Sequence, residues 1–331
     1  MRTIAIEEHF SMPAASGSPG PRAGGMVAPY MAEVGRKLTD LGDGRIADMD
    51  AAGIDVQVLS LSARGESARD PAAQTARARA ANDALAEAIG RYPRRFAGFA
   101  ALALEDPEQA ARELERCVTT LGFAGAMVDG TVGGQFLDNR RFEPVLATAE
   151  RLGVPLYLHP APPPSAVFNA YYGGLPDAVA QTLSIAGWGW HAEMGLHSLR
   201  LVVAGVFDRF PKLQIITGHM GEFIPYCLAR SDQILSRSAP HLKRRVSDYF
   251  RANFHFSTSG YFTIPPLLCA LMVFGPEHIL FAVDYPYSPN AAGRSFLDTA
   301  PVSPDALELI SHGNAERLLK LPAQRAAASS T

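Results

Sequence analysis

The sequence lacks the features that mark secreted, nucleic-acid-binding or membrane proteins. It contains only three cysteines in 331 residues, and no two of them form a CxxC pair. We therefore expect a reducing compartment, the cytoplasm. Acidic residues at positions 7 and 8 interrupt the apolar residues near the first methionine, so we expect no secretory signal.

Positive charge is not in excess, and long apolar runs are absent. Lys and Arg number 30 against 33 Asp and Glu, which gives a formal net charge of −3. A broad face that neutralises phosphates needs a basic excess, so we expect no nucleic-acid partner. No run reaches the roughly 18 apolar residues of a membrane span, so we expect no membrane partner.

Hydrophobic residues make up 47% of the chain and charged residues 19%, which excludes a disordered protein. The length fits one large α/β barrel or two ordinary domains. We find no repeat and no clear linker. The sequence therefore predicts one domain over residues 1–321, followed by a flexible tail over residues 322–331.

Short apolar runs alternate with segments of helical pattern. Eight runs predict strands buried on both faces of a parallel sheet, at residues 3–10, 56–62, 96–102, 125–130, 155–160, 214–221, 254–260 and 279–287. Helices are predicted at residues 70–92, 107–121, 142–152, 192–210 and 314–319. This alternation is typical of a (β/α)8 barrel of the TIM type. A doubly wound open sheet is the alternative, although it would usually carry a Gly-rich turn after the first strand.

Two stretches are expected to be irregular and to lie on the face that carries active sites in such barrels. Residues 11–29 are rich in Gly, Pro and Ser and follow the first predicted strand. Residues 161–174 follow the fifth predicted strand. In a barrel, the loops after the strands shape the active site.

Polar residues stand at the ends of four predicted strands. They are Glu7, His9, His159, His219 (with Glu222 three residues later) and Asp284. Side chains alternate along a strand, so Glu7 and His9 are expected to point one way and Glu8 the other. An inward Glu7 without a partner would cost several kcal/mol, and a cation removes that cost. Carboxylate and imidazole ligands of this kind bind Zn²⁺, Mn²⁺ or Fe²⁺.

The other histidines are assigned no role in this site. His191 and His197 lie on or near a predicted helix start, and His255 is expected to be a hydrogen-bond partner in the core. Cys227 has no residue positioned as its base, so a thiol nucleophile is not expected.

Several motifs together resemble a known family. They are IAIEEHF at 4–10, YLHP at 157–160, GHMGE at 218–222 and ILFAVDYPY at 279–287. With them, the chain resembles the amidohydrolase superfamily. More narrowly, it is similar to the ortho-hydroxybenzoate decarboxylases, which act on γ-resorcylate (2,6-dihydroxybenzoate) or 2,3-dihydroxybenzoate. The related aminocarboxymuconate semialdehyde decarboxylase shares the architecture.

The resemblance implies roles for individual residues. It implies one divalent metal ion, Zn²⁺ or Mn²⁺, and no organic cofactor. The implied metal ligands are Glu7, His9, His159 and Asp284. His219 and Glu222 are implied as a catalytic pair, with Asp284 also catalytic. Arg230 and Tyr287 are the expected substrate-binding residues; because the family often takes this Arg from a neighbouring subunit, we expect a homodimer or homotetramer.

Two residues depart from the family pattern. Asp129 stands where these decarboxylases usually carry Asn, and it adds a negative charge near the barrel mouth. His191 is also unusual.

The leading functional prediction is a metal-dependent, non-oxidative decarboxylase of a hydroxylated aromatic acid. In this prediction the ring carbon is protonated and CO₂ is lost, with either Asp284 or His219 as the acid. The first alternative is a metal-dependent hydrolase or hydratase that acts on a lactone, amide or enol acid, with Asp284 as base. The second is a barrel that binds a ligand without catalysis.

Overall fold

Eight parallel strands form the centre of the molecule. The computed structural model describes residues 1–12, 27–62 and 70–322. The strands pair in sequence order, from β1 to β8. They are β1 (Ile4–Phe10), β2 (Val56–Leu61), β3 (Phe96–Ala101), β4 (Gly125–Asp129), β5 (Leu156–His159), β6 (Ile215–Thr217), β7 (Phe254–Ser257) and β8 (Ile279–Leu280).

The sheet closes on itself between its first and last strands. The backbone N–H of Ile6 donates to the carbonyl of Phe281 at 3.2 Å, and Glu8 forms an isolated parallel bridge with Tyr285. The prediction of a TIM-type (β/α)8 barrel is therefore confirmed, and the doubly wound alternative is wrong.

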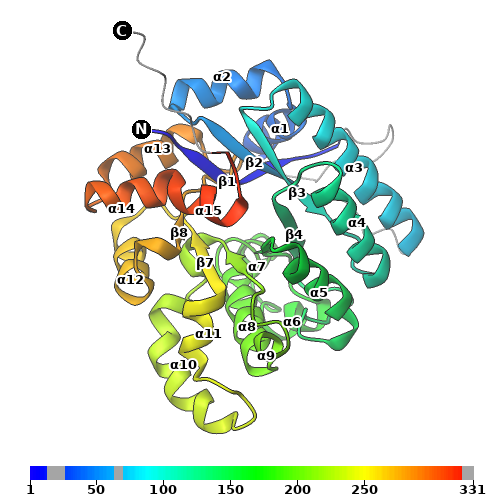
Figure 1. Cartoon of the computed structure of the whole chain (residues 1–331), viewed down its shortest axis with the longest axis vertical. Coiled ribbons are helices and arrows are strands. Elements are labelled where there is room, and N and C mark those ends of the chain that lie inside the picture. Colours follow the sequence, from blue (N-terminus) through cyan, green and yellow to red (C-terminus); the bar gives the residue numbers. More distant parts are fainter. Residues whose placement is uncertain (13–26, 63–69, 323–331) are drawn as a thin grey trace.

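Helices surround the strands, as Figure 1 shows. They are α1 (Val27–Leu38), α2 (Asp43–Ala52), α3 (Pro71–Arg91), α4 (Pro107–Thr119), α5 (Glu143–Leu152), α6 (Ser165–Tyr171), α7 (Asp177–Ser184), α8 (Gly189–Val203), α9 (Val206–Arg209), α10 (Ile224–Ser238), α11 (Val246–Asn253), α12 (Ile264–Phe274), α13 (Asn290–Thr299), α14 (Pro304–Glu308) and α15 (Asn314–Leu319). Local signals set several ends: Asp106 accepts from the Gln109 N–H just before Pro107 at the first position of α4.

Some elements differ from their predicted extents. The sixth and eighth strands are shorter than predicted, because the chain turns at His219–Gly221 and leaves the ladder after Leu280. The single helix predicted over 192–210 is two helices, α8 and α9, since Gly205 adopts a left-handed φ of 68° between them.

The two stretches expected to be irregular, and the tail, have different outcomes. Residues 161–174 contain α6, so the prediction of an irregular segment is wrong there; the helix starts directly after three consecutive prolines. Within residues 11–29, positions 13–26 lie outside the described residues and 27–29 belong to α1. Of the predicted tail, residues 323–331 also lie outside the described part.

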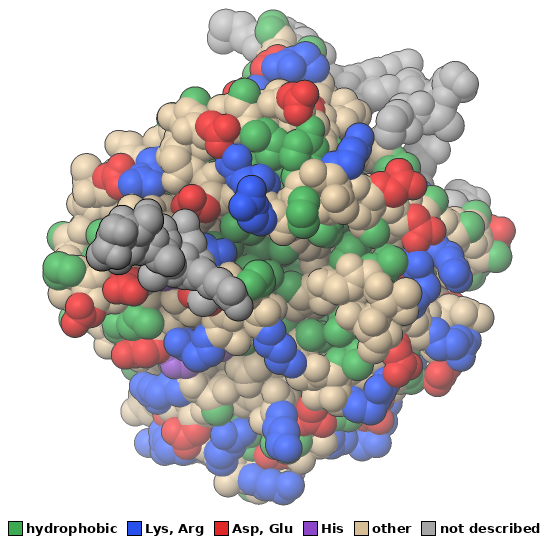
Figure 2. All heavy atoms as spheres, turned by 45° about the horizontal axis from the view of Figure 1, so that its top comes forward, with side chains coloured by type: hydrophobic (Ala, Val, Ile, Leu, Met, Phe, Trp, Pro, Cys, Tyr) green, Lys and Arg blue, Asp and Glu red, His purple; other side chains and the backbone are tan. Residues whose placement is uncertain are grey.

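Two apolar clusters pack against the strands, one inside the barrel and one outside it. A buried cluster that includes Ile4, Ile6, Val58 and Phe99 fills the centre of the barrel. A larger cluster packs the outer faces of the strands against the helices. Among the described helices, none is long and apolar enough to cross a bilayer. On the face drawn in Figure 2, acidic and basic side chains are interspersed.

Candidate metal centre and catalytic site

A bulge in β1 brings two successive residues to the barrel interior. The pairing of β1 with β2 shifts register between Ala5 and Glu8, so β1 contains one extra residue there. Ile6 packs in the central cluster, and Glu7 contacts Tyr157 of the same cluster. Glu7 and His9 therefore share a face, as predicted, while Glu8 points the other way.

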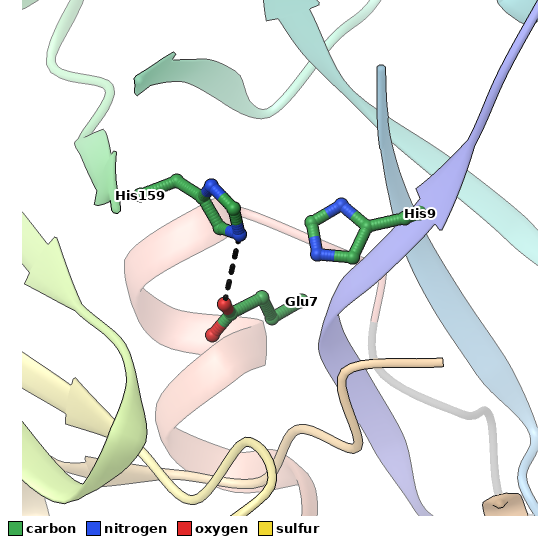
Figure 3. A group of neighbouring side chains, drawn as sticks. All are labelled: Glu7, His9 and His159. Atoms are coloured by element: carbon green, nitrogen blue, oxygen red, sulfur yellow. Dashed lines mark ion pairs between the residues drawn. The ribbon is translucent and has the colours of Figure 1, made fainter. Parts of the chain in front are cut away.

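The carboxylate of Glu7 is fully buried, and its two oxygens have different surroundings. Oε2 accepts hydrogen bonds from the hydroxyls of Tyr157, Ser257 and Ser259. Oε1 has no hydrogen-bond partner. It lies 3.7 Å from Nε2 of His159 and 4.0 Å from Nε2 of His219. Figure 3 shows Glu7 of β1 pointing toward His159 of β5, with His9 beside them.

His159 is oriented by an acidic neighbour at the end of β4. Its Nδ1 lies 2.9 Å from Oδ1 of Asp129, which leaves Nε2 directed at Glu7. Burial opposes protonation of His159, but the hydrogen bond and charge of Asp129, with the charge of Glu7, outweigh it and raise its pKa. Asp129 therefore acts directly on a predicted metal ligand.

His9 and Asp284 form the opposite side of the same group. Nδ1 of His9 contacts Oγ of Ser60 at 3.1 Å. Nε2 of His9 lies 3.2 Å from Oδ1 of Asp284, although no hydrogen bond satisfies it. Oδ2 of Asp284 lies 4.0 Å from Nε2 of His219.

Glu8 holds the backbone on both sides of Asp284. Its Oε1 accepts from the N–H of Val283 at 2.8 Å, and its Oε2 accepts from the N–H of Tyr285 at 3.1 Å. Burial raises the pKa of Glu8 well above its usual value, against the effect of these two backbone hydrogen bonds. The outward residue of the EEH motif thus fixes the segment that carries Asp284.

His219 and Glu222 form the predicted pair, and a third residue joins them. Nδ1 of His219 lies 2.7 Å from Oε1 of Glu222, and Nδ1 of His191 lies 2.6 Å from Oε2 of the same carboxylate. Burial lowers the pKa of His219, but the charges of Glu222 and Glu7 outweigh it and raise this pKa to about 10. Burial raises the pKa of Glu222, and the His219 charge and both histidine hydrogen bonds overcome that effect and lower it.

Left-handed backbone is concentrated here. Of the six non-glycine residues with positive φ in the described part of the chain, five are His219, Met220, Glu222, Phe223 and Asp284. This conformation is uncommon for residues other than glycine and is retained where the surroundings impose it. Close approach adds a constraint, since a Cβ on Gly218 would lie 2.7 Å from Oε2 of Glu7.

The residues present fit a divalent cation. Two buried ligand atoms, Oε1 of Glu7 and Nε2 of His9, have no hydrogen-bond partner. Ligand atoms of Glu7, His9 and His159 all lie within 4.8 Å of one another. Imidazole nitrogens and carboxylate oxygens are ligands that Zn²⁺ and Mn²⁺ accept.

The two predicted substrate-binding residues lie in different places. The Tyr287 ring lies 5.6 Å from the His9 ring, and its hydroxyl is 2.9 Å from Oγ of Ser62. Arg230 lies on α10, exposed to solvent, and donates to Gln233 at 3.3 Å. Within one chain, Tyr287 therefore lies beside the predicted metal ligand His9, whereas Arg230 lies on the exposed surface of α10.

Sequence reasoning missed several partners. The sequence analysis does not identify the three hydroxyls on Glu7, although Ser257 at the end of β7 and Ser259 just after it have the spacing of one strand face. The sequence predicts His191 only as a residue at a helix start, because nothing local in the chain links it to Glu222, 31 positions away. His255 is a buried hydrogen-bond partner, as predicted, with Nε2 3.2 Å from Oε1 of Gln214. His197 is also buried, and burial lowers the pKa values of His197 and His255 to about 4 and about 3.

Comparison with known proteins decides the family. Residues 12–321 match the amidohydrolase family. The chain belongs to this family. Over 330 residues it is 38% identical to the decarboxylase orsB of Emericella nidulans, with 96% of this chain and 97% of that protein covered. Over 329 residues it is 38% identical to γ-resorcylate decarboxylase of Polaromonas sp., with 96% and 98% covered.

A solved structure gives the same result. The dihydroxybenzoic acid decarboxylase of Polaromonas sp., with bound manganese and the inhibitor 2-nitroresorcinol, superposes with a TM-score of 0.86. It is 36% identical in sequence, and the match covers 96% of this chain and 97% of that one. These relatives confirm the predicted family, barrel and metal-dependent decarboxylase. The relatives favour the decarboxylase over the predicted alternatives, which are a hydrolase, a hydratase and a non-catalytic barrel.

Proposed function

We propose that this amidohydrolase removes CO₂ from a benzoate that carries a hydroxyl ortho to its carboxylate, with 2,6-dihydroxybenzoate as the first substrate to test. One observation carries the proposal: Oε1 of Glu7, Nε2 of His159, Nε2 of His219 and Oδ2 of Asp284 face one another at the carboxyl ends of the strands. Relatives that act on such acids support the substrate class.

Glu7, His9, His159 and Asp284 would hold the cation, which we propose is Mn²⁺. When bound, it supplies Lewis acidity and a template for the negatively charged oxygens of the substrate. Asp129 keeps the proton of His159 on Nδ1, so that Nε2 stays free as a ligand. Tyr287, beside His9, lines the place where an aromatic ring would lie.

His219 is the proposed proton donor. Glu222 accepts from its Nδ1, so the proton on Nε2 faces the substrate space. Nε2 gives this proton to the ring carbon that bears the carboxylate. The bond to the carboxylate then breaks, its electron pair restores the aromatic ring, and CO₂ leaves. A positioned general acid typically contributes about 10²–10⁴-fold to the rate.

The test is turnover of 2,6-dihydroxybenzoate by manganese-loaded protein, with CO₂ and 1,3-dihydroxybenzene measured together. We expect one of each per substrate consumed. His219→Asn should lower kcat by about 10²–10⁴-fold, while His241→Asn, the same change at an exposed histidine, should leave it unchanged. Absence of CO₂ from every ortho-hydroxybenzoate, or ¹⁸O from labelled water in the aromatic product, would contradict the proposal.

We further propose that Arg230 serves the site of a neighbouring subunit in a homodimer or homotetramer. On α10 the exposed Arg230 is near the 85%-exposed Tyr226, and α10 packs beside α12, which carries the 87%-exposed Met272. A second copy would cover these apolar side chains.

Subunit mixing tests this arrangement. Arg230→Ala and His219→Asn homo-oligomers should each be nearly inactive. Co-refolding them should recover about a quarter of wild-type activity if they form dimers, because some mixed sites then contain both native residues. No recovery, or a monomer by light scattering, would contradict it.

A further inference from the structure

The carboxylate of Glu222 is bound on both sides, and the family resemblance accounts for only one of them. His219 occupies Oε1 at 2.7 Å, and His191 occupies Oε2 at 2.6 Å. His191 and Glu222 are 5% and 1% exposed, so water does not compete for either contact. Buried hydrogen bonds to an ionised group are among the strongest in proteins.

Both ring nitrogens of His191 face hydrogen-bond acceptors. The carbonyl of Ala186 lies 3.2 Å from Nε2 of His191 and can only accept, so Nε2 donates. An ionised Glu222 can also only accept, so Nδ1 of His191 donates as well. His191 therefore holds Oε2 of Glu222 through Nδ1 and leaves Oε1 of the same carboxylate for His219.

The protein backbone keeps His191 in this place. His191 lies at the start of α8, and a Cβ on Gly195 of the same helix would lie 2.7 Å from the carbonyl oxygen of Glu222. The helix therefore packs directly on the turn that carries Glu222. The rings of Tyr261 and Phe223 lie 5.3 and 5.8 Å from the His191 ring and enclose it.

We propose that His191 is a positioning residue for the decarboxylation: by holding Oε2 of Glu222, it fixes the carboxylate that aims Nε2 of His219 at the substrate. This inference rests on the proposed function of His219. The contact matters because Glu222 and His219 both have left-handed backbone, which favours relaxation of the turn once its restraints are removed.

A metal ion shared by His191, His219 and Glu222 is the competing interpretation of this cluster. Each imidazole Nδ1 instead lies at hydrogen-bond distance from its own carboxylate oxygen. The two contacts are therefore explained without an ion.

A matched pair of variants separates the hydrogen bond from the volume of the side chain. In His191→Asn the amide nitrogen takes the place of Nδ1 and can donate to Glu222; in His191→Leu a side chain of nearly the same shape cannot. We expect His191→Leu to lower kcat by about 10–100-fold, with KM and manganese content within about threefold of wild type. His191→Asn should recover kcat to within about threefold.

The outcomes are decisive in each direction. Wild-type kcat in His191→Leu, equal loss in both variants, or a rise in KM with unchanged kcat would overturn the inference. If His191→Leu does not fold, His191→Gln replaces it, because its amide reaches the Nε2 position and leaves Oε2 unpaired; the same loss of kcat is expected. Wild-type turnover is measured alongside, so failure of the proposed function would show there first.

Discussion

At the scale of single residues, the two carboxylate oxygens of Glu7 have different surroundings, and the proposed site depends on this difference. One oxygen accepts hydrogen bonds from three hydroxyls, and the other has no hydrogen-bond partner and is the ligand atom that we propose for the cation. Glu7→Gln keeps the shape but removes the charge, so we expect manganese content to fall from about one per chain to below about a tenth. Elemental analysis measures this. Glu87→Gln, the same change on the exposed face of α3, is the control and should retain full metal.

Asp129 provides a second test at this scale, because it orients His159 through Nδ1. Asp129→Asn keeps an acceptor there, and Asn is the usual residue in the decarboxylases that the chain resembles. We expect manganese affinity to fall by no more than about 10-fold in Asp129→Asn, and by about 10–100-fold in Asp129→Leu. Titration of metal-free protein measures both. Equal affinity in the Leu variant and wild type would show that Asp129 does not act on the metal site.

The sequence was sufficient to predict the residues at the strand ends, because charged groups there have no packing explanation. It was not sufficient to predict their partners. His191 and Tyr157 reach the site only through tertiary packing, and their immediate neighbours in the chain show no sign of it.

At the scale of elements, Asp232 joins α10 to the start of α11. It accepts from the side chain of Arg245, from Oγ of Ser236 at 2.9 Å and from the N–H of Ser247 at 3.0 Å. Burial raises its pKa, but the backbone hydrogen bond of Ser247 and the Arg245 side chain overcome this and lower it to about 2. Because the folded pKa lies below the usual value, this stabilisation is present above about pH 4 and is lost as the pH falls through 2.

We therefore expect Asp232→Asn to lower the free energy of unfolding by about 1–3 kcal/mol at neutral pH. The difference from wild type should shrink as the pH falls toward 2, since wild-type Asp232 is then protonated too. Calorimetric melting at several pH values measures this. A difference that stays constant with pH would contradict the assigned pKa direction; Asp305→Asn on the surface is the control.

Elements were predictable where local chemistry marks their ends, as at Asp106 and Pro107 of α4. The ends of elements were harder to predict where tertiary structure determines them. The pattern predicts long strands over 214–221 and 279–287. Both segments instead leave the strand ladder early, and the residues that follow carry His219 and Asp284. The β1 bulge is likewise absent from the hydrophobic pattern, since it depends on pairing with β2.

At the scale of the whole molecule, metal binding and folding should be coupled. The proposed ligands come from β1, β5 and the segment after β8, which are brought together only in the closed barrel. An ion that binds only the folded state stabilises it, by about 2.7 kcal/mol at 100 times its dissociation constant. We expect manganese to raise the melting temperature of metal-free protein and to have no such effect on Glu7→Gln. Equal shifts in both would place the ion elsewhere.

The barrel itself could be predicted from the alternation of strands and helices, because that order has few solutions. The number of subunits could not, because exposed side chains such as Tyr226 and Met272 carry no periodic signal.

The left-handed turn at residues 219–223 has a consequence for anyone who wishes to make this protein more heat-resistant. Glycine would relax that turn, but at positions 219 and 222 it would also remove the two side chains that we propose for catalysis, so a gain in stability there would oppose the proposed activity. Lys320, which ends α15 on the surface with a φ of 54°, has the same conformation far from the chemistry. Engineering should begin at that helix end.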